Sequence, residues 1–279
     1  MTSQGRTIQI FLPDGNPRGI RLAEITSRTV QVLQIPRAHF DDAANRSGLE
    51  GPGIYFLIAD SNDGTVPRLY LGEAEDCIDR LKQHHKQKEF WSIALAASSK
   101  TRFFTKGHVK WLEWYCHKLI AEASRYALEN AAAPTEPYVS EPVKADLLDN
   151  FDTMRTLIGT LGFPLFDPLV RVSPAAQLIC KGRDAEARGE YTEDGLVVLM
   201  GSTANLQEAP SSGVTVRNIR RRLLEAGVFE LEGKVYRFTR NHVFSAPSAA
   251  ASAVLARRAN GWIEWRYPDG RTLDEVVRQ

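Results

Sequence analysis

Apolar and polar side chains alternate along the first part of the chain, and this period of two predicts short β-strands. The alternating stretches are residues 6–13, 20–25 and 29–35. Pro36 suits the first turn of a helix, so residues 36–46 predict a short helical segment. We therefore expect residues 1–50 to form a small strand-rich segment that packs on the following domain or contacts substrate.

Two apolar runs, 53–60 and 67–72, come next and flank a stretch rich in turn-forming residues. Asn62, Asp63 and Gly64 supply the chemistry of a tight turn, so the two runs predict a β-hairpin.

Two segments with apolar residues at helical spacing follow the predicted hairpin. Residues 73–85 place Ile78, Leu81 and His85 on one side of a predicted helix. A second helix, from about Lys106 to Glu129, has a buried stripe and a capping residue at Thr105. The stripe consists of Val109, Leu112, Tyr115 or Cys116, and Leu119.

A proline-rich stretch from about residue 131 marks a predicted domain edge, and residues 143–162 then predict one more helix. The remainder predicts a second domain of mixed elements. These are strands over 178–183 and 195–202, helices over 215–227 and 247–259, a hairpin over 228–240, and a final strand and turn over 261–270. The expected fold class is thus α/β, more closely α+β, with a small sheet flanked by helices and a separate C-terminal α+β domain. The expected boundaries are 1–50, 51–137, 138–170 (a helical linker) and 171–279.

Composition narrows the class of protein. The chain has 279 residues, of which 43% are hydrophobic and 25% charged, as in ordinary globular proteins. Its three cysteines form no CxxC pair, which fits a reducing compartment and argues against a cysteine-rich zinc site. The N-terminus has no pattern of a secretory signal, and no apolar run is long enough to span a bilayer. We therefore expect a cytoplasmic protein without a membrane partner.

Positive charge is clustered although the net charge is only +1. Between Arg80 and Lys118 there are nine lysines and arginines but only two acids, and a second basic group lies at 217–222. Such clusters attract a phosphate backbone, although any one of them also fits an ordinary solvated surface. The expected nucleic-acid contacts are Lys82, Lys106, Lys110, Arg217, Arg220 and Arg221.

The basic stretch holds residues suited to phosphodiester chemistry. Arg80 offers a fork of donors to phosphate oxygens, and His84 lies one helical turn later. Glu113 offers a carboxylate to a hard cation such as Mg²⁺, or it pairs with Lys110 or Lys118 on the surface. His84 holds a phosphate, assists the leaving group or is structural.

Two tyrosines on the predicted hairpin, Tyr55 and Tyr70, bring their hydroxyls toward one place. Either one requires nearby cations to act as a base, because the ordinary pKa of tyrosine is about 10. Without the other features, both would be read as core aromatics.

The strings Gly53-Ile54-Tyr55 and Tyr70-Leu71-Gly72, with Arg80, Glu113 and Asn130, resemble the GIY-YIG nuclease family over residues 51–135. Leu71 stands where the family's name-giving motif has isoleucine. The resemblance implies that Arg80 and Glu113 are catalytic, that Glu113 holds one Mg²⁺ or Mn²⁺ ion, and that Asn130 supports the site. It leaves open which tyrosine is the base. We assign that role to Tyr55 and assign Tyr70 to orienting water or phosphate.

The C-terminal part resembles an uncharacterised domain attached to some GIY-YIG proteins, and domains attached to restriction enzymes and adenine methyltransferases. The resemblance rests on Gly201-Ser202, residues 244–251, Asn260-Gly261-Trp262 and Trp265. Trp262 and Trp265 belong either to the core or to a platform for stacking bases.

These features together predict a divalent-metal-dependent endonuclease that acts on nucleic acid, with DNA favoured over RNA. The alternatives are a catalytically silent nucleic-acid-binding or scaffold protein that keeps the nuclease fold, and a phosphotransfer or repair component that needs a partner to cut.

Overall fold

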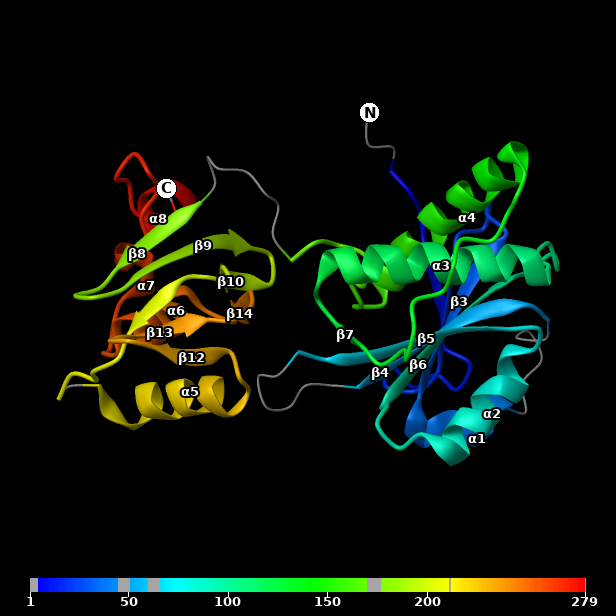
Figure 1. The fold of residues 1–279 in the computed structure, drawn as a ribbon. Coiled ribbons are helices and arrows are strands. Elements are labelled where there is room, and N and C mark those ends of the chain that lie inside the picture. The colour runs from blue at the N-terminus through cyan, green and yellow to red at the C-terminus, as the bar shows by residue number, and fades with distance from the viewer. Residues whose placement is uncertain (1–4, 45–50, 60–65, 170–176, 211, 279) are drawn as a thin grey trace. The chain divides into compact units, whose positions relative to one another are not determined.

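A computed structural model describes residues 5–44, 51–59, 66–169, 177–210 and 212–278. The chain forms two compact units, one ending at Pro168 and the other beginning at Leu169 (Figure 1). The α+β class expected from the sequence is confirmed, with a separate C-terminal region that is rich in sheet. The turn expected at Asn62, Asp63 and Gly64 lies outside the described residues. Among the described helices, none is long and apolar enough to cross a membrane.

The first unit is built on a seven-stranded sheet in the order β1-β2-β3-β6-β4-β5-β7. Its strands are β1 (Gln9–Phe11), β2 (Arg21–Glu24), β3 (Val30–Pro36), β4 (Gly53–Ala59), β5 (Arg68–Ala74), β6 (Ile93–Ser99) and β7 (Ala127–Leu128). Neighbouring strands are antiparallel except β5 and β7, which pair in parallel. The expected N-terminal segment thus supplies three strands of the same sheet that carries both tyrosines.

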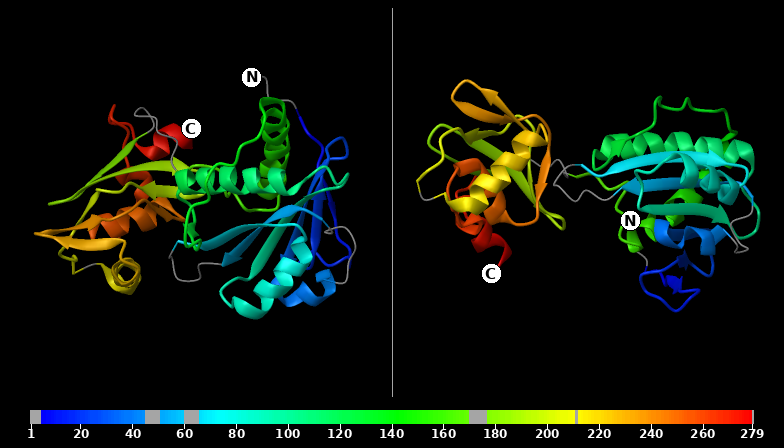
Figure 2. Two further views of the ribbon diagram at one scale, coloured as in Figure 1. Left: turned by 45° about the vertical axis from the view of Figure 1, so that its right-hand side comes forward. Right: turned by 90° about the horizontal axis from the view of Figure 1, so that it is seen from below.

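Helices cover both faces of this sheet (Figures 1 and 2). Their bounds are α1 (Phe40–Ala44), α2 (Cys77–Gln87), α3 (Lys106–Ala123) and α4 (Glu141–Thr160), with a 3-10 turn at Arg37–His39. The cap expected at Thr105 is confirmed, since its side chain accepts from the backbone N–H of His108. The α3 helix ends earlier than expected, at Ala123, because Ser124 adopts a left-handed conformation.

Side-chain alternation divides the core between the two faces. Ile54, Phe56 and Ile58 of β4 pack with α3 and α4, whereas Tyr55 and Leu57 pack with α1 and α2. The α4 helix buries a stripe in the first of these cores, so the segment expected as a linker is a packed part of the first unit. Its buried residues are Leu147, Phe151, Thr153, Met154, Leu157 and Ile158.

The second unit contains two sheets, in the orders β14-β10-β9-β8 and β11-β13-β12. Its strands are β8 (Leu178–Lys181), β9 (Glu186–Thr192), β10 (Gly195–Val198), β11 (Thr203–Asn205), β12 (Phe229–Glu232), β13 (Val235–Phe238) and β14 (His242–Phe244). Its helices are α5 (Gly213–Glu225), α6 (Pro247–Leu255), α7 (Gly261–Glu264) and α8 (Leu273–Val277). The α6 helix is almost entirely buried, with an alanine-rich surface that permits close packing.

The strand expected to begin at residue 261 is wrong, because the α7 helix occupies residues 261–264. Asn260 caps this helix by accepting from the N–H of Trp262. A side chain at Gly261 would come within 2.0 Å of the Pro247 backbone, so only glycine permits this contact with α6. Arg266, within the expected strand, makes an isolated bridge to Ile179 of β8.

Candidate active site

The β4–β5 hairpin positions the two tyrosines on the sheet face that α2 covers. Tyr55 lies opposite Gly72 and Tyr70 opposite Leu57, so the two tyrosines are diagonal neighbours. Their ring centroids are 6.4 Å apart. Gly72 creates the space for the phenol of Tyr55, because a Cβ atom there would lie 2.2 Å from Tyr55 Oη.

The α2 helix brings Arg80 and His84 to the same place. Asp76 caps its start, and the two side chains follow at positions i and i+4 on one face. His84 Nε2 lies 2.9 Å from Tyr55 Oη, and Arg80 Nε donates to the same oxygen over 3.4 Å. Arg80 also interacts with the hydroxyl of Tyr70, whose ring centroid lies 5.2 Å from that of His84. Tyr55, Tyr70, Arg80 and His84 therefore form one contact cluster, which we call the phenol cluster.

The direction of the Tyr55–His84 hydrogen bond follows from counting donors. His84 Nδ1 is buried and has no partner in the described part of the chain. If Tyr55 donates to His84 Nε2, only one buried group, the Nδ1–H, stays unsatisfied. If Nε2–H donates instead, both Nδ1 and the phenolic hydrogen lack partners. The first arrangement is favoured, and it forms a chain from Arg80 Nε through Tyr55 Oη to His84 Nε2.

Burial sets the protonation of this chain. It raises the pKa of Tyr55 well above its ordinary value, against the opposing effect of the Arg80 hydrogen bond. It also lowers the pKa of His84 to about 4, assisted by the charges of Arg80 and Lys88. Near neutral pH, the phenol of Tyr55 thus keeps its proton while His84 is a neutral acceptor. Tyr55 is only 1% exposed, whereas Tyr70 is half-buried and retains contact with solvent.

Glu113 and Asn130 come from other segments of the chain and contact the outer edge of β5. Beyond the short β7 pairing, the backbone groups of Leu71 point away from β4. Asn130 satisfies both, since its Nδ2 donates to Leu71 O over 2.8 Å and its Oδ1 accepts from Leu71 N over 3.1 Å. Glu73 is two residues on, so its N–H points to the same edge. The carboxylate of Glu113, which lies on α3, accepts a hydrogen bond from that N–H.

Glu113 is half-buried beside a second carboxylate. Burial, and then the charge of Glu73, raises the pKa of Glu113. Two adjacent carboxylates at an open strand edge suit a hard divalent cation that keeps several waters. In the described residues no group of three or more His, Cys, Asp or Glu could hold a metal, so water and phosphate would supply the other ligands.

The structure brings four of the six expected catalytic residues into direct contact and places the other two on the adjoining edge of the same strand. Tyr70 belongs to the phenol cluster on the α2 face, and Leu71 and Glu73 of the same strand contact Asn130 and Glu113. Asn130 reaches the strand through its amide alone. The hydrogen bond of Glu113 is with Glu73 rather than with a phenol or with Arg80.

The expected nucleic-acid contacts differ in their availability. Lys82 pairs with Asp79, and Lys106 pairs with Glu75, each over 3.1 Å at the exposed surface. Lys110 is exposed one turn before Glu113. Arg217 and Arg221 are exposed on α5, and Arg221 lies 3.7 Å from Glu225.

Arg220 is not available to a phosphate, because it is only 2% exposed. Its guanidinium donates to the carbonyls of Ala253, Asn205 and Leu206 and lies 3.5 Å from Glu208. It belongs to the core of the second unit, although two of its sequence neighbours, Arg221 and Arg222, are exposed.

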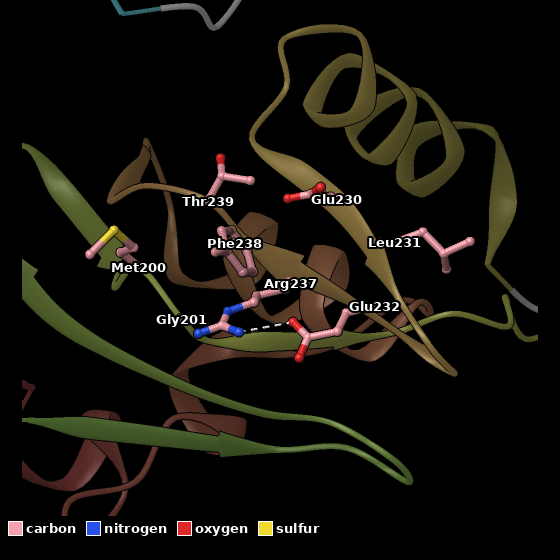
Figure 3. A pocket seen from close by; sticks show the side chains of 8 residues that line it. All are labelled: Met200, Gly201, Glu230, Leu231, Glu232, Arg237, Phe238 and Thr239. Atoms are coloured by element: carbon pink, nitrogen blue, oxygen red, sulfur yellow. Dashed lines mark hydrogen bonds and ion pairs between the residues drawn. The ribbon is translucent and has the colours of Figure 1, made fainter.

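The second unit has a surface pocket of about 530 Å³ along β12 and β13 (Figure 3). Its one cation, Arg237, pairs with Glu232 over 3.0 Å, so the lining has no free charge for an anion. Of the two tryptophans, Trp265 is fully buried and donates to Pro247 O, so it is a core residue. Trp262 is half-buried with the Arg278 guanidinium 3.6 Å from its ring centroid.

Sequence reasoning gave no role in the site to three residues beside the phenol cluster and the β5 edge, although one of them stands in the second tyrosine string. These are Gly72, Glu73 and Lys88, whose ammonium lies 4.3 Å from the Tyr70 ring centroid. Gly72 had a visible signal, because a glycine inside a strand often marks close approach of another group. Glu73 and Lys88 had no such signal in the sequence.

Comparison with known proteins finds a match only in the second unit. Residues 178–277 match the family described as "Domain of unknown function (DUF4357)". No curated protein matches the chain. No solved structure matches it either. No family model matches residues 51–135, so the comparisons do not support the resemblance of this segment to GIY-YIG nucleases.

Proposed function

We propose that the first unit is a divalent-metal-dependent endonuclease that hydrolyses phosphodiester bonds of nucleic acid, with DNA favoured over RNA. The observation that carries the proposal is the arrangement around β5. A guanidinium, two phenols and a neutral imidazole are in contact on one face, and a carboxylate lies at the adjoining edge. The resemblance of the same residues to GIY-YIG nucleases supports it.

The chain's own residues divide the work. Arg80 contacts the hydroxyls of both phenols, and its donors suit the non-bridging oxygens of a phosphate. Glu113 and Glu73 would hold the cation, which when bound supplies positive charge to the phosphate oxygens and lowers the pKa of its water. Asn130 fixes the β5 backbone between the two groups of residues.

Tyr55 takes a different role from the one expected, whereas Tyr70 keeps its expected role. Tyr55 is buried and its pKa is raised, so near neutral pH it keeps its proton and cannot accept one from water. We propose that Tyr55 positions Arg80 by accepting its hydrogen bond and positions His84 by donating one to it. Tyr70 retains contact with solvent and is the phenol that orients the attacking water.

A cleavage assay on the full chain tests the proposal. Supercoiled plasmid, single-stranded DNA and structured RNA are incubated with Mg²⁺, Mn²⁺ or EDTA. We expect metal-dependent cleavage that falls about a hundredfold or more in Arg80→Ala and Glu113→Gln, because each removes charge stabilisation from the transition state. Glu122→Gln, an exposed change on the same α3 helix, serves as the matched control.

Three outcomes contradict the proposal. These are cleavage that persists in EDTA, cleavage that survives both variants, and the absence of cleavage of all three substrates. Binding without cleavage in every condition would support a silent nucleic-acid-binding protein instead.

A further inference from the structure

A third side chain extends the row of functional groups on α2. Arg80 and His84 are four residues apart on one face of α2, and Lys88, the C-cap residue of this helix, comes four residues after His84. The rise of about 1.5 Å per residue puts Lys88 about 12 Å beyond Arg80. The ring of Tyr70 lies beside both His84 and the ammonium of Lys88.

The position of Lys88 is fixed by the backbone. It is the C-cap of α2, its N–H donates to His84 O over 2.8 Å, and its carbonyl accepts from Arg37 Nη1 over 2.6 Å. The carbonyl end of a helix favours a cation. Lys88 thus has less freedom than a lysine on an open surface.

The charge of Lys88 has no counterpart among the residues that the structure describes. Its ammonium makes no ion pair within the described ranges, whereas Lys82 on the same helix pairs with Asp79. The side chain is half-buried against Tyr70. A restrained cation without a carboxylate partner, beside a residue of the proposed site, is suited to an anion supplied from outside.

We propose that Lys88, with its ammonium over the face of Tyr70, forms a second phosphate subsite, which binds a backbone phosphate of the substrate other than the one that is cut. The inference rests on the proposed function and deepens it. Arg80 binds the scissile phosphate, and Lys88 holds the same strand further along. At about 3.4 Å per nucleotide of duplex, the second phosphate lies within about four nucleotides of the cut.

Binding measurements test this without relying on catalysis. The full chain carrying Glu113→Gln is titrated with a fluorescent oligonucleotide in EDTA at several salt concentrations. Adding Lys88→Met should weaken binding about three- to tenfold and reduce the slope of log K against log salt by about 0.7 to 0.9, the loss of one phosphate contact. Lys88→Arg should keep the slope. Lys86→Met, which removes an exposed charge from the last turn of the same helix, should leave affinity and slope nearly unchanged.

Oligonucleotides with one neutral methylphosphonate at successive positions locate the contact. One position within about four nucleotides of the cut should weaken binding to the parent protein but not to Lys88→Met. An unchanged salt slope in Lys88→Met, or the same interference pattern in both proteins, overturns the subsite. If the unsubstituted protein cuts nucleic acid normally with metal in that case, the nuclease proposal stands and only the subsite fails. If the unsubstituted protein neither binds nor cuts, the nuclease proposal fails as well.

Discussion

The phenolic oxygen of Tyr55 lies directly over Gly72 of the neighbouring strand, where a Cβ atom would come within 2.2 Å of it. The hydrogen bonds of this oxygen to His84 and Arg80 therefore depend on the absence of a side chain at Gly72.

Gly72→Ala should displace the Tyr55 ring and destabilise the first unit by about 1–3 kcal/mol, as overpacking does in well-packed interiors. Cleavage should fall as the phenol cluster loses its geometry. Urea unfolding measures the first effect and the plasmid assay the second. Gly159→Ala is the control, because its Cβ meets nothing within 4 Å and alanine is the better helix former. Equal stability of the two variants would show that Tyr55 does not need the space over Gly72.

His84 should make the first unit sensitive to mild acid. The pKa of His84 is lowered from 6.5 to about 4 in the folded protein, so the unfolded chain binds the proton more readily. Above about pH 6.5 His84 is neutral in both states and does not reduce stability. As the pH falls from 6.5 toward 4, the free energy of unfolding decreases by about 3 kcal/mol at most. Hydrogen exchange of β4 and β5 between pH 7 and 4 measures this loss.

His84→Gln should flatten that dependence, since glutamine does not titrate. His242→Gln is the matched control, because burial also lowers the pKa of His242 to about 4, but in the second unit. It should change the pH dependence of β9 and β10 and leave β4 and β5 unaffected. A steep acid response of β4 and β5 that persists in His84→Gln would assign the effect to other groups.

Asn130 should act through the backbone of Leu71 rather than through substrate. Asn130→Ala removes both of its hydrogen bonds and should cost about 1–2 kcal/mol of stability, since each bond contributes about 1 kcal/mol. The amide of Leu71 should exchange faster with solvent, which NMR detects directly. Asn130→Asp keeps the acceptor for Leu71 N but loses the donor to Leu71 O, so its effect should be intermediate at this amide. Unchanged exchange at the Leu71 amide in both variants would rule out that Asn130 holds the backbone of Leu71.

Two arginines on α5 should differ in what they affect. Arg220→Met leaves the partners of a buried cation unpaired and should destabilise the second unit by about 3–5 kcal/mol. Arg217→Met changes an exposed residue, so it should leave stability within about 0.5 kcal/mol. If the second unit binds nucleic acid, Arg217→Met should weaken that binding. Thermal unfolding and a salt titration of binding separate the two effects.

Local patterns predict much of the first unit. The alternation in residues 29–35 predicted β3, and the two apolar runs that contain the tyrosine strings predicted the β4–β5 pair. The apolar stripe that follows the capping residue Thr105 predicted α3. The pattern of Tyr55, Tyr70, Arg80 and His84 also indicated residues that meet, because a hairpin and the helix after it stay close in space.

Features set by distant contacts were not predictable in this way. The central strand β6 was missed, since its buried run of small residues has no alternation, and its place between β3 and β4 follows from pairing with both. Neither the burial of Arg220 beneath Phe229 and Tyr236 nor the packing of α4 on the sheet has a local signal. The division of roles between Tyr55 and Tyr70 depends on burial in the same way.

The place of β6 also limits how this unit can be divided or transplanted. All seven residues of β6 pair with β3 on one side, and six of them pair with β4 on the other. A fragment that starts at residue 51 would keep both tyrosines yet leave the seven residues of β6 without their β3 neighbour. Such a bare strand invites association with another copy. A functional graft of this fold into a different protein must therefore carry the first 36 residues along with the two tyrosine strings.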